Sequence, residues 1–129
     1  AAGRVMIKNK WGRIINIASI SSGGCGIAFP LTAHYTASKG GVVALTEALA
    51  LELTSQGVNV NAICPRAIDT DMSKGVKEGG QLAQVLARIP KGRLGQPEEI
   101  ASLAVFLASE ESDYISGAAI VIDGGWLTS

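Results

Sequence analysis

The sequence predicts an α/β fold built on a parallel sheet. Three short apolar segments read as strands, and helical segments separate them; the strands are expected at 14–17, 58–64 and 118–122. Short β-branched runs of this kind are typical of strands buried in a parallel sheet. Strands that alternate with helices indicate parallel pairing through right-handed crossovers. At 129 residues and 47% hydrophobic content, the chain could form the core of one small domain.

The first half of the chain is expected to run helix, strand, loop, helix. Residues 1–10 read as the end of a helix that stops before the first strand. Residues 20–33 are rich in Gly and Ser, which predicts a long loop. Residues 34–55 read as the longest helix, and Gly57 is placed to end it in the left-handed conformation.

The second half is expected to contain two shorter helices. The strand at 58–64 should end at Pro65, and residues 66–96 read as irregular apart from a short helix across 81–88. Pro97 fits the first turn of another helix, where its missing N–H is not needed, and the two glutamates after it complement the helix dipole.

Composition excludes several classes of function. Lys plus Arg equals Asp plus Glu at 11 each, so no net charge favours nucleic acid or an acidic membrane surface. No apolar run approaches the roughly 18 residues of a membrane span, and no signal peptide opens the sequence. Cys25 and Cys64 share no metal-ligand spacing, so no metal site is expected. Two thiols without a disulfide framework suit a reducing compartment, and we expect a cytoplasmic protein.

Tyr35 and Lys39 are the most informative pair in the chain. They stand four residues apart in a helical segment, so their side chains should share one helix face. A nearby cation lowers the pKa of a phenol, which lets a tyrosine exchange a proton near neutral pH. The spacing alone also fits an ordinary tyrosine and a solvated lysine, so the surrounding segments have to decide.

Those segments resemble the classical short-chain dehydrogenase/reductases. The matching segments follow one another with the family's order and spacing over nearly the whole chain: residues 12–19, the Tyr-x-x-x-Lys motif at 35–39, 59–65, 93–101 and 122–125. The resemblance implies an NAD(P)-dependent oxidoreductase that transfers hydride between nicotinamide and a carbonyl or secondary alcohol. It assigns the catalytic roles to Ser19, which orients the carbonyl, Tyr35, which acts as acid/base, and Lys39, which also holds the nicotinamide ribose.

The catalytic serine has to be distinguished from Ser21 and Ser22, which lie close by and carry the same hydroxyl group. Register with the family selects Ser19, at the carboxyl end of a strand, where ligands bind in open α/β sheets. The glycines at 23–26 do not have the Gly-x-Gly-x-x-Gly spacing, so a flexible loop is expected there rather than a phosphate site. His34 is expected at the surface or an interface.

The resemblance also assigns the nicotinamide side of a cofactor site, for NAD or NADP, to Tyr35, Lys39, Pro65, Ile68 and Thr70. The residue after Pro65 departs from the family, which usually has Gly where Arg66 stands. An arginine that kept a glycine-like backbone path would be strained. Alternatively, Arg66 points outward with the backbone path kept, or its side chain makes a contact of its own, for example with a cofactor phosphate.

The family's glycine-rich phosphate loop has no counterpart in this sequence. Residues 1–129 are therefore expected to be the C-terminal catalytic half of a doubly wound parallel-sheet Rossmann-type domain, with the N-terminal half absent. The alternative is a non-catalytic half-domain that acts as a scaffold or oligomerisation piece. Residues 72–90 contain three glycines and are expected to form a mobile lid over a small carbonyl or alcohol substrate.

The helix at 34–55 has two apolar stripes. One holds Val42, Leu45, Leu49 and Leu53, and a flatter one holds Gly41, Ala44, Ala48 and Leu51. A fully buried helix is one interpretation. We favour a helix that packs on its own sheet by one face and on a second copy by the other, giving a homodimer or homotetramer, as the resemblance also implies.

Overall fold

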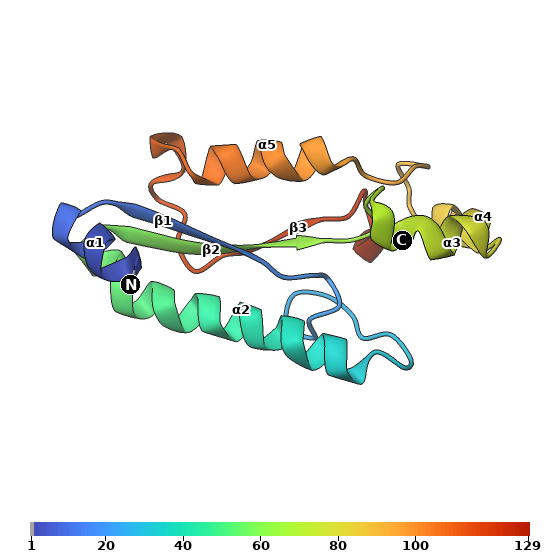
Figure 1. Ribbon diagram of the computed structural model, residues 1–129, viewed down its shortest axis with the longest axis horizontal. Coiled ribbons are helices and arrows are strands. Elements are labelled where there is room, and N and C mark those ends of the chain that lie inside the picture. The colour runs from blue at the N-terminus through green and yellow to red at the C-terminus, as the bar shows by residue number, and fades with distance from the viewer. Residues whose placement is uncertain (1) are drawn as a thin grey trace.

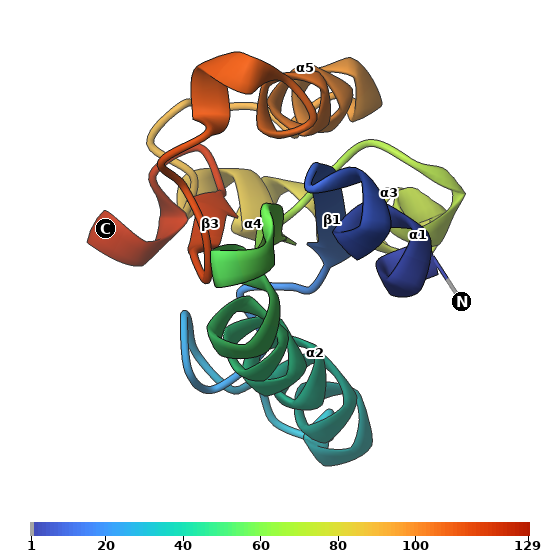
Figure 2. The same ribbon diagram turned by 90° about the vertical axis from the view of Figure 1, so that its left-hand side faces the viewer.

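The computed structural model describes residues 2–129, and its elements lie in three layers. Helix α2 (Ala33–Leu53) covers one face of a central sheet and helix α5 (Pro97–Leu107) covers the other (Figures 1 and 2). The sheet has three parallel strands in the order β1 (Gly12–Ile17), β2 (Val58–Pro65), β3 (Ala119–Ile122). The predicted α/β fold with a parallel sheet is confirmed.

The remaining helices are short. They are α1 (Ala2–Asn9), α3 (Lys74–Glu78) and α4 (Leu82–Ala87), with 3₁₀ turns at Thr54–Gln56, Asp71–Ser73, Glu110–Ser112 and Trp126–Thr128. The helix predicted at 81–88 is confirmed as α4, whereas α3 lies in the stretch that was predicted to be irregular. The helix predicted at 34–55 ends at Leu53 and continues as a 3₁₀ turn. Gly57 caps that turn with φ of 83°, as its left-handed role requires.

Strand β2 is the core of the sheet. Its residues are buried from Val58 to Cys64, because it has a strand on each side and a helix on each face. Strand β1 is only half-buried, and Ile17 is 49% exposed. Within residues 2–129, β1 pairs with β2 on one side and has no partner strand on the other. The sequence predicted a fully buried strand, whereas β1 is an edge strand in the described residues.

Helix α2 packs on the sheet by a face that the sequence pattern did not identify. Its buried residues are Val43, Thr46 and Ala50, whereas Leu45 of the predicted stripe is 52% exposed. Thr46 can be buried because its hydroxyl accepts a hydrogen bond from Asn16 Nδ2 at 2.9 Å and donates to the Val42 carbonyl at 2.8 Å. The second stripe is exposed along its length, at Gly41, Ala44, Ala48 and Leu51.

Two asparagines of β2 attach the segment that leads from α5 into β3. Asn59 Nδ2 donates to the Asp113 carbonyl at 2.7 Å, and Asn61 Nδ2 donates to the Ile115 carbonyl at 2.8 Å. Asn61 Oδ1 also accepts from the Ala118 N–H at 3.0 Å. Both asparagines are buried, so these bonds satisfy polar groups inside the molecule and fix the approach of β3.

The loop 18–32, helices α3 and α4 and the chain's C-terminus gather at the end of the sheet toward which the strands point (Figure 1). No helix within residues 2–129 has both the length and the apolar surface to cross a membrane. In the same residues, no three His, Cys, Asp or Glu side chains come together as a metal site.

Candidate active site

A cavity of about 730 Å³ opens at the carboxyl end of the sheet. It brings together Ser19, Tyr35 and Lys39, the three residues to which the sequence assigned catalysis. Most of its remaining wall is apolar and comes from the loops after β1 and β2, from α4 and from the start of α5. This is where an open parallel sheet binds its ligands.

Ser19 lies two residues beyond β1 with its hydroxyl oriented by the backbone. Its Oγ accepts a hydrogen bond from the Ser21 N–H at 3.1 Å, which leaves the hydroxyl proton free to donate. The rival hydroxyls have partners of their own: Ser21 pairs with Thr36 at 3.1 Å, and Ser22 with Cys25 at 3.0 Å. Of the three serines, Ser19 is thus the one whose Oγ has no side-chain partner and is held by a backbone N–H.

Tyr35 and Lys39 occupy the first two turns of α2. The Lys39 ammonium is 5.8 Å from the centre of the Tyr35 ring, so both side chains lie on one face of the helix, as expected. Lys39 Nζ also donates to the Ile17 carbonyl at 2.9 Å. This bond ties the lysine to the end of β1 and directs its charge toward the cavity. His34 is exposed, as predicted.

The predicted cofactor residues Pro65, Ile68 and Thr70 line the same cavity. Ile68 forms a parallel bridge with Gly95. The Asp69 N–H donates to the Gly95 carbonyl at 2.8 Å, and the Gly95 N–H donates to the Ala67 carbonyl at 3.0 Å. The N–H and carbonyl of Ile68 itself have no protein partner within residues 2–129. These free backbone groups and the Thr70 hydroxyl suit the amide of a nicotinamide, so the residues present fit that end of the cofactor.

Arg66 is neither strained nor turned outward. Its φ is not in the left-handed region, so it carries none of the strain expected of a residue in a glycine's place. Nor does it point outward: its guanidinium lies 4.5 Å from the centre of the Phe29 ring and 4.1 Å from that of Trp126. Sequence reasoning missed both aromatic residues, because they come from distant segments and neither belongs to a motif.

The glycine cluster at 23–26 closes a turn. The Ile27 N–H donates to the Ile20 carbonyl at 2.8 Å, and a Cβ added to Gly26 would stand 1.8 Å from that carbonyl oxygen. The loop is therefore pinned by a backbone contact that only glycine permits. This gives Gly26 a structural role beside the active site, and the flexibility predicted for the rest of the loop stays a prediction.

The two cysteines meet beneath this loop. Cys25 Sγ and Cys64 Sγ are 2.8 Å apart, and both thiols are free. Burial, together with the hydrogen bond between the two thiols, raises the pKa of the Cys64 thiol to about 12. Cys64 therefore stays protonated at neutral pH and acts as a packing residue.

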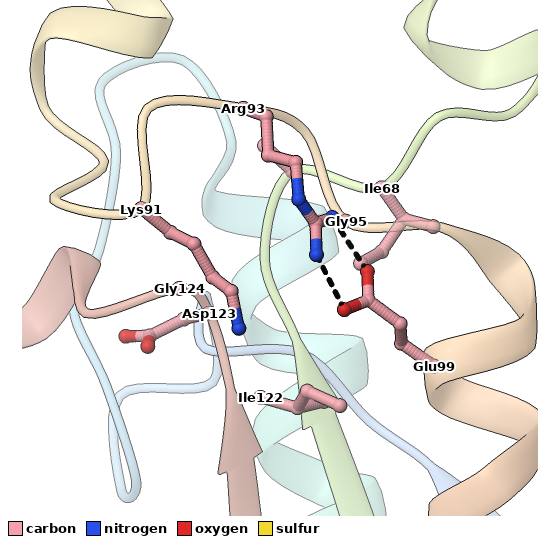
Figure 3. A pocket seen from close by; sticks show the side chains of 9 residues that line it. Ile68, Lys91, Arg93, Gly95, Glu99, Ile122, Asp123 and Gly124 are labelled. Carbon is pink, nitrogen blue, oxygen red and sulfur yellow. Dashed lines mark hydrogen bonds and ion pairs between the residues drawn. The ribbon is translucent and has the colours of Figure 1, made fainter.

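A second, smaller cavity of about 150 Å³ lies between β3 and the start of α5 (Figure 3). Arg93 spans one side and forms two hydrogen bonds to the Glu99 carboxylate, at 2.7 and 2.8 Å. Glu99 also accepts from the Gln96 N–H at 2.8 Å. The arginine and that backbone donor lower the pKa of Glu99 to about 2. This network holds Gly95 against the Ile68 segment, so it supports the main cavity.

Sequence comparisons place the chain among known enzymes. The family model described as enoyl-(acyl carrier protein) reductase matches residues 1–127. A 2-dehydro-3-deoxy-D-gluconate 5-dehydrogenase of Bacillus subtilis is 46% identical over 128 residues, which make up 98% of this chain and 49% of that protein. A 3-oxoacyl-[acyl-carrier-protein] reductase of Vibrio harveyi is 44% identical over 124 residues, or 95% of this chain and 48% of the enzyme. The chain spans about half the length of these relatives.

Solved structures give the same result. A gluconate 5-dehydrogenase from Burkholderia cenocepacia, in complex with NADP and tartrate, superimposes with a TM-score of 0.90 at 33% identity; the match covers 98% of this chain and 49% of that one. A 3-oxoacyl-[acyl-carrier protein] reductase from Brucella melitensis has a TM-score of 0.87 at 32% identity, with 98% and 46% covered. By its sequence and its fold, this chain belongs to the classical short-chain dehydrogenase/reductase family.

Proposed function

We propose that this chain is the catalytic half of an NAD(P)-dependent oxidoreductase that interconverts a carbonyl and a secondary alcohol. The observation that carries the proposal is the meeting of Ser19, Tyr35 and Lys39 in one cavity at the carboxyl end of the sheet. The named relatives act on gluconate derivatives and on 3-oxoacyl groups, and both kinds of substrate carry such a reacting centre.

Each of the three side chains has a distinct task in this proposal. Ser19 donates its free hydroxyl proton to the substrate oxygen and orients the carbonyl. Tyr35 gives its proton to that oxygen during reduction and takes it back during oxidation. Lys39 keeps a positive charge beside the tyrosine and binds the ribose next to the nicotinamide. The nicotinamide, when bound, supplies or accepts the hydride.

The cofactor is NAD or NADP in this proposal, with Tyr35, Lys39, Pro65, Ile68 and Thr70 as its contacts. The free N–H and carbonyl of Ile68 support this assignment, as does the NADP found in the Burkholderia relative. The glycine-rich phosphate loop would come from an N-terminal half that precedes these residues. We further propose that 72–90 form the substrate lid, because Met72, Val76 and Val85 line the cavity.

A homodimer or homotetramer through α2 is also part of the proposal. The exposed small residues Gly41, Ala44 and Ala48 would let a second copy of the helix approach closely, and Leu51, at 87% exposure, would then be buried. Leu51→Glu should halve the mass measured by light scattering. We also propose a reducing, cytoplasmic setting, because Cys25 and Cys64 touch without being joined.

The test of the activity is Tyr35→Phe in the native gene product that contains this chain. Reduction of carbonyl substrates should be lost, while NADPH or NADH binding, measured by fluorescence, stays within a few fold. Tyr114→Phe is the matched control, because Tyr114 is fully exposed and should leave turnover unchanged. If Tyr35→Phe retains most of its turnover, the acid/base assignment is wrong.

A non-catalytic half-domain is the second candidate, and the outer edge of β1, which is unpaired within residues 2–129, favours it. Under either candidate, residues 1–129 alone should associate and show no reductase activity. Size-exclusion chromatography with light scattering, run beside a reductase assay, tests this. A gene product of this length that binds no NAD(P) would support the scaffold over the enzyme.

A further inference from the structure

Within residues 2–129, Arg66 packs against two aromatic rings and has no ionic partner. Its guanidinium lies between Phe29, from the loop before α2, and Trp126, from the turn after β3, and those two rings meet edge to face with centres 6.4 Å apart. Three segments distant in sequence therefore hold one cation in place. Stacking on ring faces leaves the N–H groups at the guanidinium edge available to another acceptor.

The donors of this cluster are unsatisfied. Within residues 2–129, two buried side-chain nitrogen or oxygen atoms have no hydrogen-bond partner, and they are Arg66 Nε and Trp126 Nε1. Both are donors, and they belong to two residues in contact. Buried polar groups in native proteins are nearly always paired, so this cluster is one whose donors the protein itself leaves unsatisfied.

The local charge is also uncompensated. The ion pairs within the described residues use other carboxylates, and none involves Arg66. A second cation, Arg88, stacks on the same tryptophan, with its guanidinium 4.5 Å from the centre of the Trp126 ring. Burial, and then Arg88, lower the pKa of Arg66, and the Tyr35 phenol opposes them without reversing the direction.

Arg66 faces the same cavity as Ser19 and Tyr35. That cavity is lined by two cations, Arg66 and Lys39, and the part of the chain that the structure describes contributes no Asp or Glu to its wall. Lys39 is tied to the Ile17 carbonyl. A negative group on a ligand in this cavity would therefore find Arg66 as its free, pre-oriented partner.

We propose that Arg66 binds an anionic group, a carboxylate or phosphate, carried by the carbonyl or alcohol substrate. This inference rests on the proposed oxidoreductase function and narrows its substrate to a small acid. A guanidinium forms two parallel hydrogen bonds with such a group, and its stacking partners keep it oriented for that geometry. Arg66 is then a specificity-determining residue at a position where the resembling family usually has glycine.

The experiment compares gluconate with glucitol, its uncharged counterpart, by calorimetry on the native product that contains this chain. Gluconate should bind about 10- to 100-fold more tightly, the gain expected for a charged hydrogen-bonded pair. Arg66→Gln should abolish that preference. Arg88→Gln is the matched control, because Arg88 stacks on the same tryptophan but does not line the cavity, and it should retain the preference.

Further arms separate the alternatives. Arg66→Lys keeps the charge and should retain part of the preference, which guards against a glutamine variant that fails to fold. NADPH affinity should be equal in wild type and Arg66→Gln; a loss there, with no effect on gluconate, assigns the arginine to a cofactor phosphate and overturns the proposal. The absence of any Arg66-dependent preference for gluconate, or for inorganic phosphate, also overturns it. Because binding is measured without turnover, an inactive protein that still shows the preference refutes the proposed activity alone.

Discussion

Asn61→Leu should destabilise the protein more than the same change at Asn59, the other buried asparagine of β2. Asn61 is 1% exposed, and its amide holds the Ile115 carbonyl and the Ala118 N–H. Leucine has the same branching and number of side-chain heavy atoms, so it leaves no cavity, but it leaves two backbone groups unpaired. Each such group costs about 1–3 kcal/mol when buried, so the free energy of unfolding should fall by about 2–6 kcal/mol.

The assay is urea denaturation of the native product, followed by far-UV circular dichroism. Asn59→Leu is the graded comparison, because it frees only the Asp113 carbonyl and should cost about 1–3 kcal/mol. Gln84→Leu is the control, since this exposed side chain should change stability by less than about 0.5 kcal/mol. If Asn61→Leu costs no more than Asn59→Leu, the two-bond account of β3 attachment is refuted.

Three further outcomes follow from the contacts described above. Gly26→Ala should lose about 1–3 kcal/mol or more in the same assay, because its Cβ would meet a backbone carbonyl, whereas Gly24→Ala has only an ordinary contact at 3.9 Å and should be near neutral. Iodoacetamide at mildly alkaline pH should modify Cys25 before Cys64, whose pKa is about 12; equal labelling by mass spectrometry would contradict the burial of that thiol. Glu99 has a pKa of about 2 instead of 4.5, so its stabilisation is present above pH 4.5 and lost as the pH falls toward 2. Urea midpoints over that range should therefore fall more steeply for wild type than for Glu99→Gln, and parallel curves would argue against the ion pair.

The strand and helix order could be predicted from sequence because it depends on local patterns. Gly57 and Pro97 acted as expected at their helix ends. The packing face of α2 could not be predicted, because hydrophobicity gives no reason to bury Thr46. Its burial depends on Asn16, thirty residues earlier in the chain, which supplies the hydrogen bond. Such polar pairs form only once the fold brings the strand and the helix together.

The candidate site divides in the same way. Ser19, Tyr35 and Lys39 could be chosen from motifs, and the structure brings all three to one cavity. The environment of Arg66 could not be predicted, because its partners Phe29 and Trp126 lie far from it in the sequence, one before it and one after it. The departure from the family pattern at Arg66 correctly marked this position as unusual, but the sequence could not predict the direction of its side chain.

Several polar groups that the fold leaves unpaired belong to residues of the main cavity. The Ser19 hydroxyl proton, the Ile68 backbone groups and the Arg66 guanidinium have no protein acceptor or donor within residues 2–129, and all three residues line that cavity. Elsewhere the side chains of Asn59, Asn61 and Thr46 make hydrogen bonds within the protein. A folded chain pairs buried polar groups wherever it can, so a concentration of free donors in one apolar cavity indicates groups kept for a ligand. Under the proposed function, a substrate that places an oxygen near Ser19 and an anion near Arg66 would pair with both, and an oxo acid or a hydroxy acid has that pattern.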